Sequence, residues 1–327
     1  MTSMQIRNKY IIKRQRYPSM DFRETQGAIK FAKTLFEQKL SDVLHLEKVV
    51  SPIYIKDESY HDTLDGAQRP IKFDFKNGEH GMILHSLAKW KRAILSKYGY
   101  KDGEGIVTDM LAIRRDEDIS RLHSYLVDQW DWEMTISKQK RDLHFLHEVV
   151  ERIFGVLKEV ENEVNARYPT LSKKLPSHIT FITTQELENL YPEMTMDERE
   201  YAIVKKHKAV FISQIGGKLM SGKVHSVRAP DYDDWMLNGD ILVYNAKMDC
   251  AEELSSMGIR VDAESLKEQL AKRSCDTITD YHRRIMQEEY VYSVGGGIGQ
   301  SRVILFLLEK EHIGDVQADT EFNNSKN

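Results

Sequence analysis

One short segment with alternating chemistry constrains the fold of this chain more than any other part of the sequence. In Gln129-Trp130-Asp131-Trp132-Glu133, polar residues alternate with tryptophans. Because successive side chains of a β-strand point to opposite faces of its sheet, Gln129, Asp131 and Glu133 are predicted to share one face. The segment is therefore expected to be a strand that carries a row of polar groups.

Two other segments supply cationic groups that complement this row. Arg114-Arg115-Asp116-Glu117-Asp118 places guanidinium groups beside an acidic cluster, and Gly295–Arg302 is a flexible glycine run that ends with an arginine just inside a predicted helix. Guanidinium groups bind phosphate oxygens in pairs, and glycine allows a nucleotide to approach the backbone closely. The glycine run lacks the Gly-Lys-Ser/Thr of a Walker loop. Together, the three segments suit a site that holds ATP and presents it to a small amphoteric substrate.

The composition limits the class of protein. With 327 residues, of which 41% are hydrophobic and 30% charged, the chain can bury a large core and is typical of a soluble globular protein. Its 47 basic and 51 acidic residues give a net charge of −4, which argues against a protein that coats nucleic acid. The apolar run Val303–Leu308 is too short to cross a bilayer. Cys250 and Cys275 form no CxxC or zinc spacing, so we expect a reduced, cytoplasmic protein without nucleic-acid or membrane partners.

The periodicity of apolar residues predicts one α+β catalytic domain over residues 1–327, with a mostly antiparallel sheet flanked by helices. One helix is expected from Asp21, which forms a capping pair with Glu24, and another from a capping box at Thr195 and Glu198. Further helices are predicted over residues 85–96 and 143–164. Strands are predicted at residues 49–55, 106–113, 124–133, 179–183, 209–215 and 241–244, before a final strand, turn and helix that carry the glycine run. Residues 57–80 are expected to be loop-rich.

Proline and the two ends of the chain qualify this outline. Pro52 has no N–H to donate, so strand 49–55 is expected at an edge, a bulge or a subunit contact. Residues 1–20 form a basic segment without acidic residues, which faintly resembles a transit peptide but contains little serine. The polar residues 317–327 are expected to be partly disordered.

A series of motifs resembles the aspartate–ammonia ligases, the ammonia-dependent asparagine synthetases, which are related to the aspartyl and asparaginyl branch of class II aminoacyl-tRNA synthetases. The resemblance covers nearly the whole chain, and the motifs that carry it are His85–Arg92, Arg114–Asp118, Gln129–Glu133, Arg228–Trp235, Leu237–Asp240, Glu253–Arg260 and Gly295–Arg302. It implies a class II synthetase-like fold. It also implies a two-step reaction, in which the aspartate side chain attacks the α-phosphorus of ATP and ammonia then displaces AMP from the β-aspartyl adenylate.

The resemblance assigns one group of residues to ATP and magnesium. Arg114 is implied as the ligand of the α-phosphate, although Arg115 lies nearer the acidic residues, as the synthetase arginine does. Arg302 is implied to stack on adenine and to reach the terminal phosphate. The remaining residues implied here are Ser256, Gly297 and Gly299 for the nucleotide, and Asp240 and Glu253 for Mg²⁺, which prefers oxygen ligands.

A second group is implied to bind aspartate and ammonia. Lys91 and Arg260 are expected to hold carboxylates, and Asp131 the substrate ammonium. Gln129, Ser86, Arg228, Asp233 and Ser255 complete the implied substrate site. The loop acid Asp62 is implied to attract ammonium and accept its proton, a suitable task for a carboxylate near the reacting carbonyl. Lys89 and Arg92 are expected to face solvent on the same helix as Lys91.

Two other functions remain open from the sequence. A tRNA-charging enzyme of the same fold is expected to carry an appended anticodon-binding module, and the first predicted helix begins by residue 21, which leaves no room for one upstream. A sensor of amino acid or nucleotide without turnover is expected to lose the phosphate arginines or the metal acids, and Arg114, Arg302, Asp240 and Glu253 are present. Residues 22–55 resemble the motif that forms a two-fold interface in these synthetases, so the resemblance also implies a homodimer.

Overall fold

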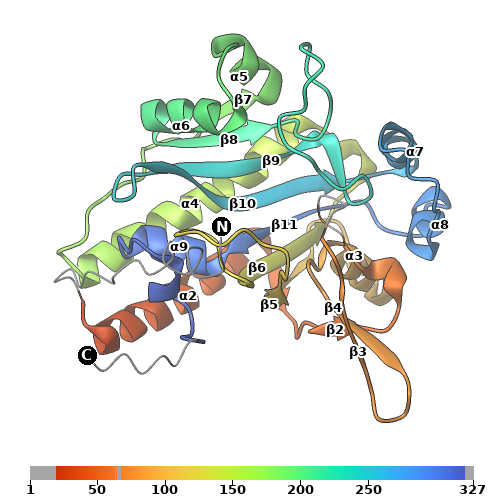
Figure 1. The fold of residues 1–327 in the computed structure, drawn as a ribbon, viewed down its shortest axis with the longest axis horizontal. Coiled ribbons are helices and arrows are strands. Elements are labelled where there is room, and N and C mark those ends of the chain that lie inside the picture. Colours follow the sequence, from red (N-terminus) through yellow and green to blue (C-terminus); the bar gives the residue numbers. More distant parts are fainter. Residues whose placement is uncertain (1–19, 63, 65–67, 321–327) are drawn as a thin grey trace, which may run out of the picture.

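A mixed β-sheet forms the centre of the molecule (Figure 1). The computed structural model describes residues 20–62, 64 and 68–320; the expected basic segment, apart from Met20, and residues 321–327 of the expected polar tail lie outside the described residues. Within the described part the sheet has eight strands in the order β1-β5-β6-β11-β10-β9-β8-β7. Their bounds are Leu46–Lys48 (β1), Gly105–Ile113 (β5), Leu126–Thr135 (β6), Ser293–Gly299 (β11), Cys250–Arg260 (β10), Asp233–Asn245 (β9), Ala209–Ser213 (β8) and Thr180–Thr183 (β7).

The expected antiparallel arrangement holds only in the middle of this sheet. Neighbouring strands from β5 to β8 are antiparallel, whereas β1 pairs with β5 and β7 with β8 in parallel. A small antiparallel sheet, in the order β2-β4-β3, lies apart from it and consists of Tyr54–Ile55 (β2), Ile71–Asp74 (β3) and His80–Ile83 (β4). The sheet is therefore mixed, and the α+β class is as predicted.

Helices cover both faces of the large sheet. The α-helices are Phe22–Leu44 (α2), Ala88–Tyr98 (α3), Leu143–Arg167 (α4), Thr184–Leu190 (α5), Met196–His207 (α6), Ala263–Lys272 (α7), Asp280–Met286 (α8) and Gln300–Leu307 (α9), with 3₁₀ turns at Glu58–Tyr60 (η1), Lys138–Lys140 (η2) and Ile313–Asp315 (η3). The apolar faces of α2, α4 and α9 form the main core with the inner face of the sheet. α3 contacts β5, β6 and β11 on the other face (Figure 1). No helix in the described ranges is long and apolar enough to cross a membrane.

The predicted alternation of polar residues and tryptophans over residues 129–133 is confirmed. Trp130 and Trp132 are buried in the main core, where Trp130 stacks on Phe36 of α2 with ring centroids 4.2 Å apart. Asp131 and Glu133 point to the face that α3 covers. The predicted capping pair at the start of α2 and the capping box at the start of α6 are also present.

The predicted strand over residues 49–55 is wrong, and Pro52 is the physical reason. The Val49 amide still donates to the Val107 carbonyl at 2.9 Å, so pairing with β5 extends just past β1. Pro52 cannot donate, and the chain then leaves the large sheet to form β2 in the small one. β3 and β4 lie within or just beyond the region that was expected to be loop-rich, and β10 was not predicted at all.

The glycine run is a strand and not a flexible turn. It forms β11 between β6 and β10, and none of its glycines has a positive φ. Glycine is required here by space: a Cβ on Gly295 would meet the Glu133 carboxylate, with Cδ at 2.7 Å, and one on Gly297 would meet the Gln129 amide, with Cδ at 2.6 Å. A Cβ on Gly296, on the other face, would meet Met257 Cβ at 2.5 Å. The three glycines therefore leave room for side chains of neighbouring strands.

Gly296→Ala should destabilise the fold because the neighbour that its Cβ meets includes the rigid backbone of β10. We expect a loss of about 1–3 kcal/mol, typical of overpacking in a core. Chemical denaturation measures it. Gly155→Ala in α4 is the matched control, because nothing lies within 4 Å of its added Cβ and alanine favours a helix. Equal stability of the two variants would show that β11 tolerates side chains.

Candidate active site

A buried ion pair joins α3 to the polar face of β6. The ammonium of Lys91 contacts the Asp131 carboxylate and lies 3.7 Å from Glu133 Oε2. It also donates to the Trp132 carbonyl at 2.8 Å and the Gly296 carbonyl at 3.3 Å. Lys91 is 0% exposed. Its three N–H groups are thus used within the protein, and its charge is held directly beneath the polar row.

A second buried cation continues this row. Arg260 at the end of β10 donates to Glu133 from Nε at 2.9 Å and from Nη2 at 2.6 Å, and its Nη1 donates to Asp233. Attraction to Arg260 holds the pKa of Glu133 below its ordinary value even though burial acts to raise it. Counting Lys91 and Asp131 with these groups, two cations face three carboxylates. We call these five side chains the ionic row; its net charge of −1 favours a cationic ligand.

Two carboxylates, Asp240 of β9 and Glu253 of β10, lie near each other on adjacent strands. Asp240 of β9 lies opposite Ser256, and Arg228 donates to one oxygen of Asp240. The other oxygen, Oδ1, is buried without a hydrogen-bond partner. Burial raises the pKa of Asp240 to about 7, and the negative charge of Glu253 adds to the rise while Arg228 opposes it. Asp240 and Glu253 are therefore close enough to repel each other, and a cation between them would relieve that repulsion.

The two predicted phosphate arginines lie near each other. Arg302 at the start of α9 donates to the Leu122 carbonyl at 2.9 Å and the Glu253 carbonyl at 3.1 Å. Burial lowers the pKa of His123, and the positive charges of both Arg302 and Arg114 lower it further. The His123 imidazole is therefore within electrostatic range of both guanidinium groups, although these come from distant parts of the sequence. The structure brings these arginines together on the side of the sheet where Glu253 lies.

Arg114 and Arg115 have different surroundings. Arg114 makes a 4.0 Å ion pair with Glu117, and its Nε is buried without a hydrogen-bond partner. Arg115 is turned toward the Pro70 carbonyl at 3.4 Å. The neighbouring Asp116 is bound by Arg69. The free, buried Nε and the nearby Arg302 make Arg114 the better placed of the two to receive a ligand.

The remaining predicted residues lie along the same three strands. Ser255 donates to the Gly297 carbonyl at 3.0 Å, which ties β10 to β11. Gln129 occupies the space that Gly297 leaves, and a Cβ on Gly299 would lie 3.1 Å from the Cβ of Arg302. Gln129, Gly297 and Gly299 therefore share one surface between the ionic row and the arginines. Ser255 instead pairs with Ile298 and Ile241 of the main core, so its side chain lies on the opposite face.

Asp62 is buried at the edge of this surface. It is 1% exposed; its Oδ1 accepts from the Leu64 amide at 2.7 Å, and its Oδ2 has no hydrogen-bond partner. Burial raises the pKa of Asp62 to about 6, although Lys89 and the Ser86 hydroxyl favour the ionised form. Ser86 itself accepts from the Ala88 amide at 3.1 Å at the start of α3. Asp62 thus has one free oxygen in a site that favours a proton.

The expectation that Lys89 and Arg92 face solvent is wrong. Lys89 is 6% exposed and its ammonium lies 2.6 Å from Asp231 Oδ2, which also contacts His282 Nε2 at 2.9 Å. Arg92 is 2% exposed and donates to the Val261 carbonyl at 2.8 Å. α3 is packed between the sheet, α7 and α8, so helical spacing alone could not identify an exposed side.

The structure adds Glu133 to the site residues. The sequence placed it on the polar face without giving it a partner, and the structure shows that it binds Arg260 and also accepts from Ser293 at 2.7 Å. Its alternation with Gln129 and Asp131 was the signal that could have identified it. Asp231, which lies in the motif Arg228–Trp235, contacts Lys89 and His282.

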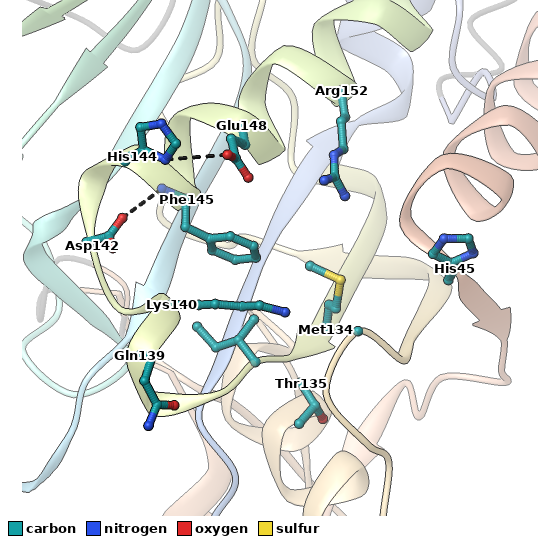
Figure 2. A pocket seen from close by; sticks show the side chains of 12 residues that line it. His45, Met134, Thr135, Gln139, Lys140, Asp142, His144, Phe145, Glu148 and Arg152 are labelled. Carbon is teal, nitrogen blue, oxygen red and sulfur yellow. Dashed lines mark hydrogen bonds and ion pairs between the residues drawn. The ribbon is translucent and has the colours of Figure 1, made fainter.

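A separate hollow lies at the far end of β6 and the start of α4 (Figure 2). Its volume is about 370 Å³, and Lys140, Phe145 and Arg152 are among the side chains around it. None of the residues predicted for ATP, aspartate or metal lines it. The candidate site is therefore the surface of the central strands and not this pocket.

Comparison with known sequences identifies the family. The family described as AsnA, aspartate-ammonia ligase, matches residues 23–326. The chain belongs to the aspartate–ammonia ligase family. It is an ATP-dependent ligase that forms L-asparagine from L-aspartate and ammonia. This membership favours the ligase over the tRNA-charging enzyme and the sensor that the sequence alone left open.

Individual relatives agree along nearly the whole chain. An aspartate–ammonia ligase of Ruminiclostridium cellulolyticum is 50% identical over 314 residues, which cover 94% of each chain. One of Fusobacterium nucleatum is 52% identical over 303 residues, which cover 92% of this chain and 93% of the relative.

Solved structures show the same fold at low sequence identity. Asparaginyl-tRNA synthetase of Pyrococcus horikoshii, complexed with asparaginyl-adenylate, gives a TM-score of 0.65 at 13% identity and covers 90% of this ligase. The enzyme of Entamoeba histolytica gives 0.63 at 14% identity, also with 90% coverage. The ligase spans 68% and 66% of the lengths of these synthetases. The fold is therefore that of class II aminoacyl-tRNA synthetases, as the motifs predicted.

Asp62→Asn should stabilise the unliganded ligase at high pH only. The folded-state pKa of Asp62, about 6, lies above the ordinary value of 3.8, so the folded protein holds this proton more tightly and loses stability as pH rises through that interval. We expect a gain of about 1–3 kcal/mol at about pH 8 and almost none at about pH 4. Denaturant unfolding at the two pH values measures it, with the exposed Asp74→Asn as control. A gain that does not depend on pH would contradict the buried, strained carboxylate.

Proposed function

We propose that the candidate site activates the side-chain carboxylate of aspartate as its adenylate and transfers it to ammonia. The carboxylate attacks the α-phosphorus of ATP, pyrophosphate leaves, and ammonia then displaces AMP. The observation that carries this proposal is the position of Arg114 and Arg302 around one imidazole, at the end of a surface whose other end is the ionic row. A polyphosphate and a zwitterion thus have oppositely charged places on the same three strands.

Aspartate binds at the ionic row in this proposal. Asp131 and Gln129 take the substrate ammonium, which the net negative charge of the row favours. Arg260 faces a substrate carboxylate. Only part of its donor set is used by Glu133 and Asp233, since a guanidinium has five N–H groups.

Lys91 acts on aspartate mainly through its charge. Its three N–H groups already contact Asp131 and two backbone carbonyls. Burial raises the pKa of Asp131 and Lys91 opposes that rise, so Lys91 favours the ionised carboxylate and fixes it in place. It also adds positive potential beneath the substrate. Ser86 and Asp233 bound this part of the site, and Ser255 supports it from the core face through its hydrogen bond to the Gly297 carbonyl.

ATP lies along β10 and β11 in this proposal. Arg114 receives the α-phosphate, and its unpartnered Nε supplies one donor. Arg302 stacks on the adenine and reaches the terminal phosphate, while Gly297, Gly299 and Ser256 allow the nucleotide to approach the strands.

Asp240 and Glu253 fit a magnesium ion. Asp240 offers a buried, unpartnered oxygen, and the mutual repulsion of the two carboxylates favours a cation between them. Among the residues described, no cluster of three or more His, Cys, Asp or Glu side chains could hold a metal alone. The proposal is therefore an ion shared with phosphate oxygens and water, which neutralises polyphosphate charge when bound. Arg228 holds the other oxygen of Asp240.

Asp62 takes the first proton of ammonium. Its free Oδ2 can accept an N–H, and burial brings the pKa of the carboxyl closer to neutral pH.

A cytoplasmic location is also proposed, because Cys250 and Cys275 are both unpaired thiols.

Product analysis tests the reaction. With ATP, magnesium, aspartate and ammonium, we expect asparagine, AMP and pyrophosphate in equal amounts. Arg302→Ala should lower the rate by about 100-fold or more, the effect of removing one donor to developing charge. The exposed Arg23→Ala is the control. Aspartate-dependent ATP–pyrophosphate exchange without ammonium-dependent asparagine, or transfer of labelled aspartate to tRNA, would overturn the proposal.

The β1–β5 edge supports a homodimer. Apolar side chains are exposed there on neighbouring segments: Val50, Ile53 and Tyr54 after β1, and Leu111 and Ile113 on β5. Exposed apolar side chains grouped in this way are typical of a protein interface. Among the described residues, β1 is the edge strand of the large sheet on this side.

Val50→Asp should therefore separate the dimer, because Val50 is 93% exposed and its replacement would bury a charge at the interface. Light scattering is expected to give twice 38.1 kDa for the parent chain and 38.1 kDa for the variant. Leu190→Asp, at the opposite edge of the sheet, is the matched control and should stay dimeric. A monomeric parent chain would contradict the proposal.

A further inference from the structure

Two histidines beside Asp62 are buried without hydrogen bonds. His61 is 9% exposed and His85 0%, and their ring centroids lie 4.8 Å apart with the planes tilted by 61°. All four ring nitrogens lack a partner, as does Asp62 Oδ2. Buried polar groups are nearly always hydrogen-bonded, so such a cluster requires an explanation. The fold alone does not need five unsatisfied atoms in one place.

The position of the pair relates it to the reaction. His61 precedes Asp62 in the chain. His85 precedes Ser86, whose hydroxyl favours the ionised form of the Asp62 carboxylate. His85 also feels the positive charge of Arg114. His85 therefore lies between the proposed base and the proposed α-phosphate ligand, which is where the carbonyl of an aspartyl adenylate would react.

The proton balance of the reaction requires a second acceptor. Ammonium carries four protons and the amide nitrogen of asparagine carries two, so two protons must leave the nitrogen. Asp62 accounts for one, which it takes before attack. The other leaves after the nitrogen lone pair forms the C–N bond and as the C–O bond to AMP breaks, with its electron pair on the phosphate.

We propose that a ring nitrogen of His85 accepts this second proton, and that His61 passes it toward the surface. The proposal rests on the proposed function, since it assumes the aspartyl adenylate and the role of Asp62. No further reactant is needed, because both protons end in solvent and AMP is the leaving group. His85 is the proton acceptor of the amide-forming step and has no part in forming the adenylate.

The electrostatic surroundings keep both rings uncharged in the resting enzyme. Burial lowers the pKa of His85 and Arg114 adds to this, while the backbone of Asp62 and the charge of Asp116 oppose it. Burial also lowers the pKa of His61, to about 4, with His85 and Lys89 adding. The charges of Glu58 and Lys72 act on His61 in opposite directions. At neutral pH each ring is therefore uncharged and has one nitrogen with a free lone pair.

The central test separates the two half-reactions. His85→Gln keeps a polar side chain but cannot accept the proton, so we expect the amide-forming step to slow by about 100-fold or more. Aspartate-dependent ATP–pyrophosphate exchange should stay close to that of the parent enzyme. The exposed His178→Gln is the control for a histidine outside the site. Parent-like amide formation, or an equal loss in both half-reactions, would overturn the inference.

Hydroxylamine distinguishes the two proton acceptors. It is uncharged at neutral pH, so no proton has to be removed by Asp62 before it attacks. Its nitrogen still loses one proton after the attack, and this is the proton assigned to His85. Asp62→Asn should therefore make aspartyl hydroxamate at nearly the parent rate while making little asparagine, whereas His85→Gln should be slow with both nucleophiles. Rescue of His85→Gln by hydroxylamine would contradict its role.

A measurement on Asp62→Asn covers the case in which His85→Gln does not fold. In single turnovers of preformed adenylate with hydroxylamine, the rate per uncharged hydroxylamine should fall as pH drops below the ordinary histidine range, because a protonated His85 cannot accept a proton. A rate that does not change with pH would overturn the inference. Absence of any aspartate-dependent exchange in the parent enzyme would instead refute the proposed function itself.

Discussion

The ionic row beneath β6 is the interaction on which the rest of the site depends. Its cations, Lys91 and Arg260, are almost fully buried, and they come from a helix and a strand that are far apart in the sequence. Removing one partner from a buried pair costs about 3–5 kcal/mol, because a charge is left without compensation. The row therefore holds α3 and the end of β10 in one arrangement against β6, and it does so with groups that can also interact with a charged substrate.

The glycines of β11 follow from that row. β11 lies between β6 and β10, and Glu133 and Gln129 lean across it on the polar face. Any side chain on Gly295 or Gly297 would occupy the space of Glu133 or Gln129. Glycine is therefore required at both positions, and at Gly295 it leaves the space in which Glu133 binds Arg260. Glycine weakens a strand, but here both neighbours are long strands of the same sheet, which provide the hydrogen bonds that keep β11 extended.

The sequence predicted the parts of this structure that repeat a simple period. The cap at Asp21, the apolar stripe of α4 and the alternation of β6 are all local signals, and each is confirmed. Strands β9 and β10 were missed in part or entirely because their site-facing residues, such as Asp240 and Ser256, are polar, so the sequence does not read as a core strand. The flexibility expected of the glycine run and the solvent exposure expected of Lys89 on α3 were wrong for a related reason: the constraints on Gly297 and Lys89 come from neighbours that only the tertiary fold brings together. Of the site residues that the resemblance placed on these strands, Asp131, Ser256 and Asp240 share the polar face, whereas Ser255 lies on the core face.

Unsatisfied atoms mark three places along that surface. Asp240 Oδ1, Asp62 Oδ2 and Arg114 Nε are all buried without partners in the unliganded chain. Each such group costs about 1–3 kcal/mol, so the free enzyme gives up stability at the points proposed for metal, ammonium and phosphate. A ligand that completes these contacts recovers that cost, and one that lacks the matching group does not. Discrimination among substrates can thus arise from atoms the protein leaves unpaired, since an analogue without the right donor or acceptor keeps the penalty in place.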